Sequence, residues 1–223
     1  MTAIILQARI DSARLPGKAL LLLDGKPIIY RVMEALNNVP ADLRILACPE
    51  DSTAAFSSIA EKAGFKIHSG PKEDVLERFC QAIRRFNLKR IIRATGDNPF
   101  VFTDAAAAIN NEAVTLNADY AGFAGLPYGA GVESVCAAAL LGATSDSANP
   151  YEREHVCPFL YNHGNLYKLH RPVAPEEWHA PDLRLTIDTR NDYERAVKLF
   201  DILKNEPDRY NGEIIIHRAK AIL

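Results

Sequence analysis

Short apolar runs alternate along the first half of this chain with stretches whose apolar residues recur at helical spacing, and this alternation is the strongest constraint on its fold. Four runs of four to six residues are typical of buried strands, because they are too short for a membrane span. They cover residues 3–8, 43–48, 65–68 and 90–94. Short connections between alternating strands and helices favour right-handed crossovers and a mainly parallel sheet with helices on both faces. The pattern therefore predicts an α/β fold in a single domain over residues 1–223.

The second half of the chain continues this pattern with weaker signals. We expect strands at 118–123, 132–136, 166–170 and 184–188, an alanine-rich helix ending near Leu116, and a helix beginning within 151–158. Thr189 and Asp192 have the spacing of a capping box, which predicts a helix that runs to about Leu203. Because those two residues serve the cap, Asp188 is expected to be free at the end of the preceding strand. Residues 213–223 are compatible with either a helix or a strand.

Composition and charge exclude several classes of protein. The 223 residues are 48% hydrophobic and 24% charged, and the net charge of −2 argues against a general nucleic-acid or anionic-membrane binder. No run of about eighteen apolar residues is present, and Arg9 and Asp11 interrupt the first apolar run before it resembles a signal peptide. The four cysteines contain no C-x-x-C pair, which is typical of inert thiols in a reducing compartment. We therefore expect a cytoplasmic protein that binds neither nucleic acid nor membrane.

A basic loop follows the first predicted strand. Arg9, Arg14 and Lys18 fall within ten residues, and Pro16-Gly17 favours a turn between them. Three cations about 10 Å apart repel one another by roughly 2 kcal/mol per pair at an effective dielectric constant of about 20, and Asp11 is the only nearby acid. Such a loop is either solvated and paired with distant acids, or it binds a polyanion. Because open α/β sheets bind ligands at the carboxyl ends of their strands, the position favours phosphate binding.

Asp97 follows the predicted strand 90–94, so it is expected at the same sheet edge as the basic loop. In the sequence Thr95-Gly96-Asp97-Asn98-Pro99 an Asx turn would account for it. Next to bound phosphates a carboxylate has a second use, because Mg²⁺ takes one or two carboxylates together with phosphate oxygens. Glu133 is another candidate functional acid, since it interrupts the apolar run 132–136.

Several motifs resemble those of the sugar cytidylyltransferases, the family that includes CMP-KDO and CMP-sialic acid synthetases. Gln7-Ala8-Arg9, Ser12 and Arg14-Leu15-Pro16-Gly17-Lys18 resemble the opening signature of that family. The later segments that carry the likeness are 70–79, 93–99, 127–133, 152–158 and 184–193, and they are most similar to the branch of spore coat polysaccharide biosynthesis protein F. The resemblance implies a Rossmann-like, three-layer α/β/α fold of the nucleotide-diphospho-sugar transferase (GT-A-like) type, with a mostly parallel mixed sheet.

The resemblance also implies roles for individual residues. Arg14 and Lys18 would be the catalytic cations on the triphosphate, and Asp97 and Asp188 would bind Mg²⁺. The implied nucleotide-binding residues are Gln7, Ala8, Arg9, Ser12, Arg14, Lys18, Arg93, Thr95 and Gly96, with a structural salt bridge as an equal alternative for Arg93. Glu133, Glu154 and His155 are expected to face the acceptor sugar, although a lone histidine is more often structural. Residues 124–182 would form the acceptor side of the cleft and a contact in a homodimer.

Together these features predict a nucleotidyltransferase that moves CMP from CTP to an acidic sugar and releases pyrophosphate, for surface polysaccharide biosynthesis. The general base is not identifiable, and Glu133 and His155 are its candidates. Gly131 stands where the family usually has aspartate, and Cys157 where this branch has threonine. Three alternatives remain open: a glycosyltransferase of the same fold, a transferase specific for another nucleoside triphosphate, and a catalytically weakened nucleotide-binding protein in polysaccharide assembly.

Overall fold

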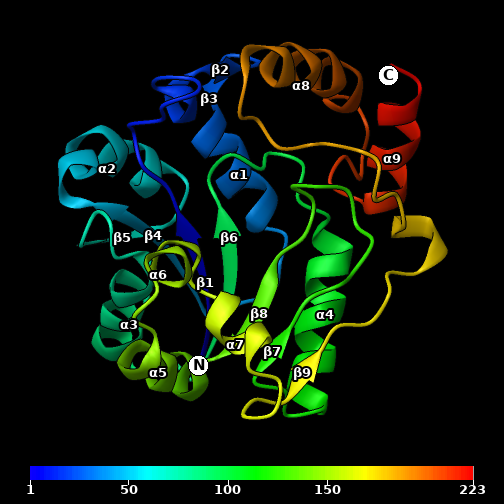
Figure 1. The fold of residues 1–223 in the computed structure, drawn as a ribbon. Helices are drawn as coiled ribbons and strands as arrows, with labels where there is room; N and C mark the ends of the chain where they lie inside the picture. Colours follow the sequence, from blue (N-terminus) through cyan, green and yellow to red (C-terminus); the bar gives the residue numbers. More distant parts are fainter. Residues whose placement is uncertain (223) are drawn as a thin grey trace.

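A computed structural model describes residues 1–222 of the chain, and a β-sheet runs through its centre (Figure 1). Within the described residues this sheet has seven strands in the order β5-β4-β1-β6-β8-β7-β9. The strands are β1 (Thr2–Gln7), β4 (Leu43–Pro49), β5 (Lys66–Gly70), β6 (Arg90–Thr95), β7 (Tyr120–Ala121), β8 (Glu133–Cys136) and β9 (Leu169–His170). Strands β1, β4, β5 and β6 are parallel, whereas β8 is antiparallel to both β6 and β7. The prediction of a mostly parallel mixed sheet is confirmed.

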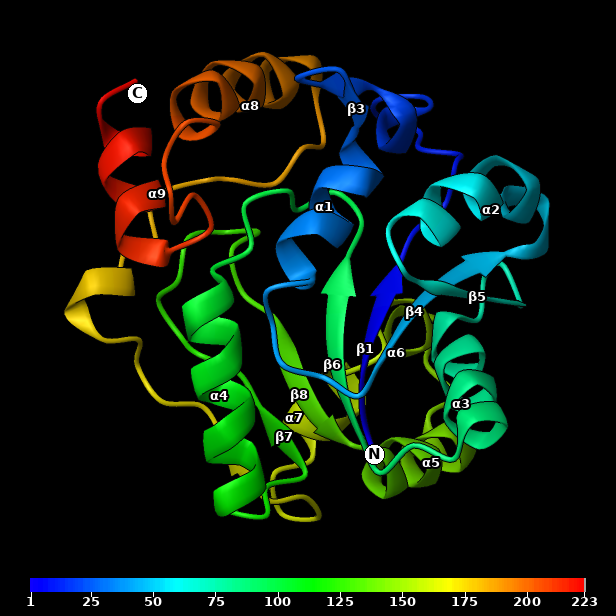
Figure 2. The same ribbon diagram turned by 180° about the vertical axis from the view of Figure 1, so that it is seen from behind.

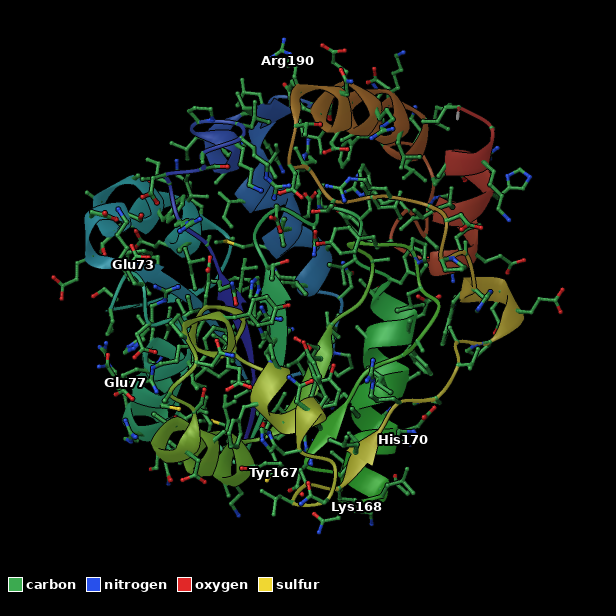
Figure 3. All side chains as sticks on the ribbon, in the orientation of Figure 1. Glu73, Glu77, Tyr167, Lys168, His170 and Arg190 are labelled. Carbon is green, nitrogen blue, oxygen red and sulfur yellow. The ribbon has the colours of Figure 1, made fainter. Side chains whose placement is uncertain are left out.

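Helices cover both faces of the sheet, so the molecule has three layers (Figures 1 and 2). One face carries α1 (Ile28–Leu36), α2 (Thr53–Lys62), α4 (Thr103–Thr115), α8 (Arg190–Leu203) and α9 (Gly212–Lys220). The other face carries α3 (Val75–Phe86), α5 (Ala137–Asp146), α6 (Pro150–His155) and α7 (Pro158–Asn162). Among residues 1–222, no helix combines the length and the apolar character needed to cross a bilayer. Charged side chains such as Glu77, Lys168 and Arg190 lie at the periphery (Figure 3).

The side chains of β1 alternate between two hydrophobic cores, one on each face of the sheet. Ala3 and Ile5 belong to the core shared with α3 and α5, whereas Ile4 and Leu6 belong to the core shared with α1 and α8. All four side chains are fully buried. This follows from the period of two in a strand that is covered on both sides, and it explains the unbroken apolar sequence of the predicted strand.

Strands β1 and β6 end at the same edge of the sheet, where Gln7 is paired with Thr95. Beyond that pair, the N–H of Gly96 donates to the carbonyl oxygen of Gln7 at 2.8 Å. The basic loop and the loop that carries Asp97 therefore leave the sheet side by side, as expected for the carboxyl ends of parallel strands.

A short hairpin returns the chain from the basic loop to α1. It consists of β2 (Leu22–Leu23) and β3 (Lys26–Pro27), and it follows a turn of 3₁₀ helix, η1 (Lys18–Leu20). Asp24 and Gly25 connect the two strands with φ of 50° and 73°, as a type I′ turn requires. Two further 3₁₀ turns are η2 (Glu50–Ser52) and η3 (Glu176–Trp178).

The prediction of a strand at 184–188 is wrong. Arg184 forms an isolated bridge with Tyr128, and the residues after it belong to no strand. Their backbone partners lie in loops: the N–H of Leu185 donates to the carbonyl of Tyr128 at 2.8 Å, and that of Ile187 to the carbonyl of Asp97 at 2.9 Å. Because these partners are not part of a strand, a regular ladder does not form. The segment nevertheless reaches the loop that carries Asp97.

Other predictions for the second half were also partly wrong. The strands expected at 118–123 and 166–170 shrink to the two-residue strands β7 and β9, and α5 was not predicted. The helix expected within 151–158 is divided into α6 and α7, because Val156 adopts φ of 72°, which a β-branched residue rarely does. Residues 213–223 were compatible with either a helix or a strand, and the structure has the helix α9 there. Leu223 lies outside the described residues.

Candidate active site

A cleft of about 630 Å³ opens at the carboxyl edge of the parallel strands. Its walls come from the loops after β1 and β6, the glycine-rich loop before β8, α6 and the segment before α8. All fourteen predicted site residues line it: Gln7, Ala8, Arg9, Ser12, Arg14, Lys18, Arg93, Thr95, Gly96, Asp97, Glu133, Glu154, His155 and Asp188. The structure therefore brings these residues together, and their individual roles remain predictions.

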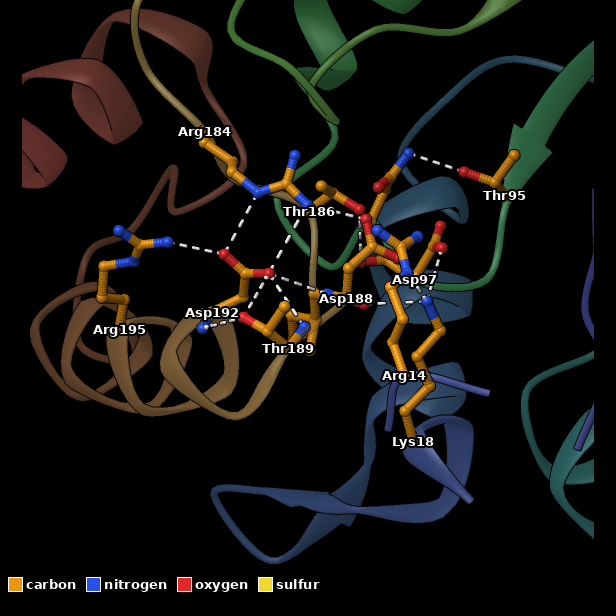
Figure 4. Close-up of polar contacts among 12 residues, drawn as sticks. Arg14, Lys18, Thr95, Asp97, Arg184, Thr186, Asp188, Thr189, Asp192 and Arg195 are labelled. Carbon is orange, nitrogen blue, oxygen red and sulfur yellow. Dashed lines mark hydrogen bonds and ion pairs between the residues drawn. The ribbon is translucent and has the colours of Figure 1, made fainter. Parts of the chain in front are cut away.

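The turn at Pro16-Gly17 directs Lys18 into the cleft. The N–H of Lys18 donates to the carbonyl of Leu15 at 3.1 Å and closes the turn. Gly17 has φ of 67°, a left-handed conformation that glycine adopts without a steric penalty. Lys18 then begins η1, and its side chain extends toward the loop after β6 (Figure 4).

The ammonium group of Lys18 lies between two carboxylates from distant parts of the chain (Figure 4). Its Nζ donates to Oδ2 of Asp97 at 2.8 Å, to Oδ1 of Asp188 at 2.9 Å and to the carbonyl of Ile187 at 2.9 Å. The side chain of Lys18 is only 15% exposed. All three N–H donors of this ammonium are therefore used within the cleft.

Asp188 is held by two further cations, so the prediction that it is free is wrong. Arg14 contacts Oδ1 of Asp188 at 2.8 Å, and Arg184 contacts Oδ2 at 2.7 Å. Burial disfavours the charged form of this carboxylate, but the hydrogen bonds of Lys18 and Arg184 and the charge of Arg14 outweigh it and lower the pKa of Asp188. Asp188 is therefore an ionised carboxylate in a cluster of cations.

The start of α8 fixes the position of Asp188. Thr189 and Asp192 form the predicted capping box, which is confirmed. Oδ2 of Asp192 also accepts a hydrogen bond from the N–H of Asp188 at 3.1 Å, and Arg184 and Arg195 contact Oδ1. Burial opposes ionisation of Asp192, yet these donors lower its pKa well below the ordinary value. The capping residue Asp192 thereby fixes the backbone of Asp188, and with it the position of the Asp188 carboxylate.

The donor set fits a hard divalent cation that completes its coordination with phosphate oxygens and water. Within residues 1–222, no group of three or more His, Cys, Asp and Glu side chains is arranged to hold a metal by itself. Asp97 and Asp188, however, both lie within hydrogen-bond distance of one cationic nitrogen. Mg²⁺ is commonly bound by one or two carboxylates plus the phosphates of a substrate. Two carboxylates are therefore sufficient for this class of site.

The floor of the cleft on the β8 side is a partly buried network around Glu133. Arg93 forms an ion pair with Glu133 and donates from Nε to Oε1 of Gln7 at 3.0 Å. Tyr120 donates its hydroxyl to Oε1 of Glu133 at 2.8 Å. Burial, and then the charge of Glu133, raise the pKa of Tyr120, so the hydroxyl stays a donor. Arg93 therefore makes the salt bridge that was one of its two predicted roles.

The short helix α6 brings Glu154 and His155 to the mouth of the cleft, where both are exposed. The ring of His155 packs against that of Tyr151 at a tilt of 48°, with the centroids 4.3 Å apart. Arg153 anchors the helix, because its Nε donates to Oδ2 of Asp74 at the start of α3 at 2.8 Å. Both predicted acceptor-side residues on α6 are therefore accessible from the cleft.

Two cleft-lining cations were missed from the sequence. Lys72 bridges Asp11 of the basic loop at 2.6 Å and Asp51 at 2.8 Å. Arg78 lines the cleft, is 2% exposed and donates to the carbonyl of Pro71 at 2.6 Å. The burial of Arg78 could have been predicted from the sequence, because it follows Val75 by three residues and therefore lies on the apolar face of α3. Lys72 had no comparable signal, because its partners come from other loops.

The fold is that of an α/β protein of the nucleotidyltransferase type, with a charged cleft at the carboxyl edge of its sheet. The fold is similar to that of a cytidylyltransferase from Leptospira borgpetersenii serovar Hardjo-bovis (strain JB197), with a TM-score of 0.90, 24% identity and coverage of 99% of this chain and 94% of that one. A structure of CMP:2-keto-3-deoxy-manno-octonic acid synthetase complexed with CTP has a TM-score of 0.70 at 16% identity, covering 90% of this chain and 98% of that one. At these identities the likeness concerns the fold.

The chain belongs to the cytidylyltransferase family, whose family model matches residues 3–215. It is also 34% identical over 218 residues to the spore coat polysaccharide biosynthesis protein SpsF of Bacillus subtilis (strain 168). That similarity covers 95% of this chain and 91% of the relative. The resemblance found in the sequence motifs is thereby confirmed.

Proposed function

We propose that this chain is a Mg²⁺-dependent sugar cytidylyltransferase that transfers CMP from CTP to a hydroxyl of an acidic sugar and releases pyrophosphate. The observation that carries the proposal is the convergence of Arg14 and Lys18 with Asp97 and Asp188 at one cleft. The cleft volume of about 630 Å³ is in the usual range for small-molecule sites. Family membership and the names of the SpsF and CTP-bound relatives support the reaction class. The proposed setting is surface polysaccharide synthesis in the cytoplasm.

In the proposed reaction the sugar hydroxyl oxygen attacks the α-phosphorus of CTP. The bond from that phosphorus to the bridging oxygen breaks, and pyrophosphate leaves with the electron pair, while the hydroxyl proton passes to a base. Glu133 and His155 are the candidates for this base. Glu133 already accepts hydrogen bonds from Arg93 and Tyr120, whereas His155 is exposed at the mouth. No covalent enzyme intermediate is required.

The cations of the basic loop would stabilise the charge that develops during transfer. Arg14 and Lys18 are proposed to contact the leaving phosphates and Arg9 the α-phosphate. Fixed cations at positions where charge develops lower the barrier more than they stabilise the substrate. When bound by Asp97 and Asp188, Mg²⁺ would supply a Lewis acid for the phosphate oxygens.

The remaining cleft residues are proposed to divide between the two substrates. The CTP side would include Gln7, Ala8, Ser12, Arg93, Thr95 and Gly96, and the sugar side Glu133, Glu154 and His155; all of them line the cleft. Residues 124–182 supply much of the sugar side, and we propose that this region also forms the contact of a homodimer.

Pyrophosphate release from each of the four nucleoside triphosphates, against a panel of acidic sugars, tests the proposal directly. We expect release with CTP, and a drop of about 10²–10³-fold in turnover for Arg14→Ala. The thermal midpoint of that variant should hardly change, because the Arg14 side chain is 66% exposed and exposed ion pairs contribute little. Arg190→Ala is the matched control: it is equally exposed, pairs with Glu194 outside the cleft, and should keep full activity.

The alternatives give different results in the same assay. A glycosyltransferase would consume a nucleotide sugar and leave CTP intact. A transferase with another base preference would release pyrophosphate from a different nucleoside triphosphate. A nucleotide-binding protein without activity would bind CTP and release no pyrophosphate with any acceptor.

A further inference from the structure

We infer that Lys18 is an internal cation that holds Asp97 and Asp188 when no nucleotide is bound, so that divalent metal and nucleoside triphosphate bind this cleft cooperatively. The inference rests on the proposed function, because it concerns the same site and its two proposed ligands. It assigns to Lys18 control of access to the metal-binding carboxylates, in addition to its proposed contact with phosphate.

The ammonium group of Lys18 bridges the carboxylates of Asp97 and Asp188, as a bound metal ion would. Its Nζ lies 2.8 Å from Oδ2 of Asp97 and 2.9 Å from Oδ1 of Asp188, and the carbonyl of Ile187 accepts its third N–H at 2.9 Å. A divalent cation between these two carboxylates would compete with Lys18 for Oδ2 of Asp97 and Oδ1 of Asp188, while Arg184 holds the other oxygen of Asp188. Lys18 and the metal therefore compete for one position.

The charges around the two carboxylates are already compensated. Asp188 accepts from Arg14 and Arg184 as well as from Lys18, and Arg184 also contacts Asp192. A divalent cation approaching without a counter-ion would thus meet three positive side chains next to its two carboxylate ligands. Because like charges in a partly buried site repel strongly, metal binding without nucleotide should be weak.

A triphosphate changes this balance because it offers the cations other partners. Lysine is a compact charge on a flexible four-carbon stem, so it can turn from the carboxylates to phosphate oxygens within the same cleft. Arg14 is 66% exposed and is free to follow. The carboxylates that are released then become available to the metal. By thermodynamic linkage, metal must strengthen triphosphate binding by the same factor.

The first test compares Mn²⁺ binding by electron paramagnetic resonance in wild type and Lys18→Met, both without nucleotide. Methionine keeps most of the stem and removes the charge. We expect Lys18→Met to bind Mn²⁺ about tenfold or more tightly than wild type, in the range of typical coupling factors. The double variant Lys18→Met/Asp97→Asn should lose this gain, which would assign the bound ion to this carboxylate pair. Lys26→Met is the matched control. Lys26 does not line the cleft, and its Nζ lies 3.2 Å from Oε1 of Glu34.

A second arm uses the wild-type protein only and stays informative if Lys18→Met does not fold. Calorimetry measures CTP binding in EDTA and in saturating Mg²⁺, with the affinity of Mg²⁺ for free CTP subtracted. Cooperative binding predicts a gain of about tenfold in CTP affinity with the metal. Equal CTP affinity in the two conditions would overturn the inference, as would a folded Lys18→Met that binds Mn²⁺ no more tightly than wild type.

These outcomes are separate from those of the proposed function. If wild type releases pyrophosphate from CTP but Lys18→Met gains no Mn²⁺ affinity, the inference fails and the function stands. If no nucleoside triphosphate yields pyrophosphate while Lys18→Met gains Mn²⁺ affinity, the function fails and the competition between Lys18 and metal stands.

Discussion

Gly96 shows how a residue without a side chain shapes the cleft. Its N–H donates to the carbonyl of Gln7 at 2.8 Å, so the loop that carries Asp97 lies against the end of β1. A Cβ at this position would stand 2.8 Å from Cβ of Ala8 and 2.9 Å from Cδ1 of Ile29. Both distances are shorter than the optimal separation of nonbonded carbon atoms. The close approach of the two loops therefore depends on glycine.

We expect Gly96→Ala to lower the free energy of unfolding by about 1–3 kcal/mol, as overpacking does. CTP binding should also weaken, because the Asp97 loop must move away from the basic loop. Gly142→Ala in α5 is the matched control: apart from its chain neighbours and the backbone of α5, no atom lies within 4 Å of a Cβ there, and alanine favours a helix over glycine by about 0.5–1 kcal/mol. Urea unfolding measures both variants. Unchanged stability of Gly96→Ala would show that the loops can accommodate a methyl group.

His68 in β5 is a buried polar residue whose ring makes no hydrogen bond among residues 1–222. It is 5% exposed, its ring packs edge-on against Phe86, and neither ring nitrogen has a hydrogen-bond partner within the described residues. Burial, and then the charge of Arg85, lower the pKa of this imidazole. As pH falls, the unfolded chain is therefore protonated first, at about pH 6.5, and the folded state only at lower pH. Stability must decrease with falling pH across that window.

The expected contribution of His68 is a decrease of at most about 1.4 kcal/mol in the free energy of unfolding per pH unit below about pH 6.5. His68→Leu should reduce this slope, because leucine fills the buried position without titrating. Urea unfolding at several pH values measures the slopes. Identical slopes for wild type and His68→Leu would mean that the folded protein accommodates a charged imidazole.

At the scale of elements, the beginning of α8 carries two functions. It satisfies the free N–H groups of the helix through Thr189 and Asp192, and it holds the N–H of Asp188 at 3.1 Å from Oδ2 of Asp192. The same carboxylate also binds Arg184, which in turn contacts Asp188. Helix capping and the placement of a proposed metal ligand are therefore coupled.

Thr189→Ala should lower the free energy of unfolding by about 1 kcal/mol, the usual effect of removing a capping hydroxyl. We also expect weaker metal binding in the presence of CTP, because Asp192 loses one of the contacts that orient it. Thr115→Ala is a suitable control, since Thr115 is exposed at the end of α4, and substitutions at such surface positions usually change stability by less than about 0.5 kcal/mol. Similar stabilities of the two variants would argue against the capping box as a stabilising feature.

At the scale of the whole molecule, the net charge of −2 conceals a concentration of charged residues of both signs in the cleft. The basic residues that line the cleft are Arg9, Arg14, Lys18, Lys72, Arg78 and Arg93. Five acidic residues of the described chain, Glu73, Asp97, Glu133, Glu154 and Asp188, line the same cleft, and three of them pair with these cations. The distribution of charge, which the fold decides, is therefore more informative than its sum.

The two hydrophobic cores share one sheet, so we expect residues 1–223 to unfold as a single domain. Trp178, the only tryptophan of the chain, packs against Phe123 with ring centroids 5.6 Å apart. Its fluorescence therefore follows the unfolding of the region around Phe123. Far-UV circular dichroism reports on all helices. Coincident thermal transitions by both probes are expected, and a separate fluorescence transition would indicate an independently unfolding unit.

Much of the cleft could be predicted from the sequence because the relevant residues follow strongly apolar strands. β1 and β6 are buried on both faces, so their apolar runs mark them clearly, and the residues after them must meet at one sheet edge. Arg14, Lys18 and Asp97 were located in this way. The capping box of α8 was also recognisable, because it depends on two residues three positions apart.

The prediction failed where a residue's environment depends on partners far away in the chain. The segment 184–188 has the apolar pattern of a strand, but its neighbours are the loops at Tyr128 and Asp97. Asp188 was expected to be free, and three cations from two regions of the chain surround it. Val156 breaks the helix through a backbone conformation with positive φ, which valine's own propensity does not indicate.

The sequence by itself therefore determined the order of strands and helices in the first half of the chain, the family and the sheet edge at which the charged residues gather, because these depend on local periodicity and short motifs. Only the tertiary structure decided which charges face each other. The ammonium of Lys18 lies between Asp97 and Asp188 because the chain crossings bring three distant segments together, and no local pattern encodes that contact.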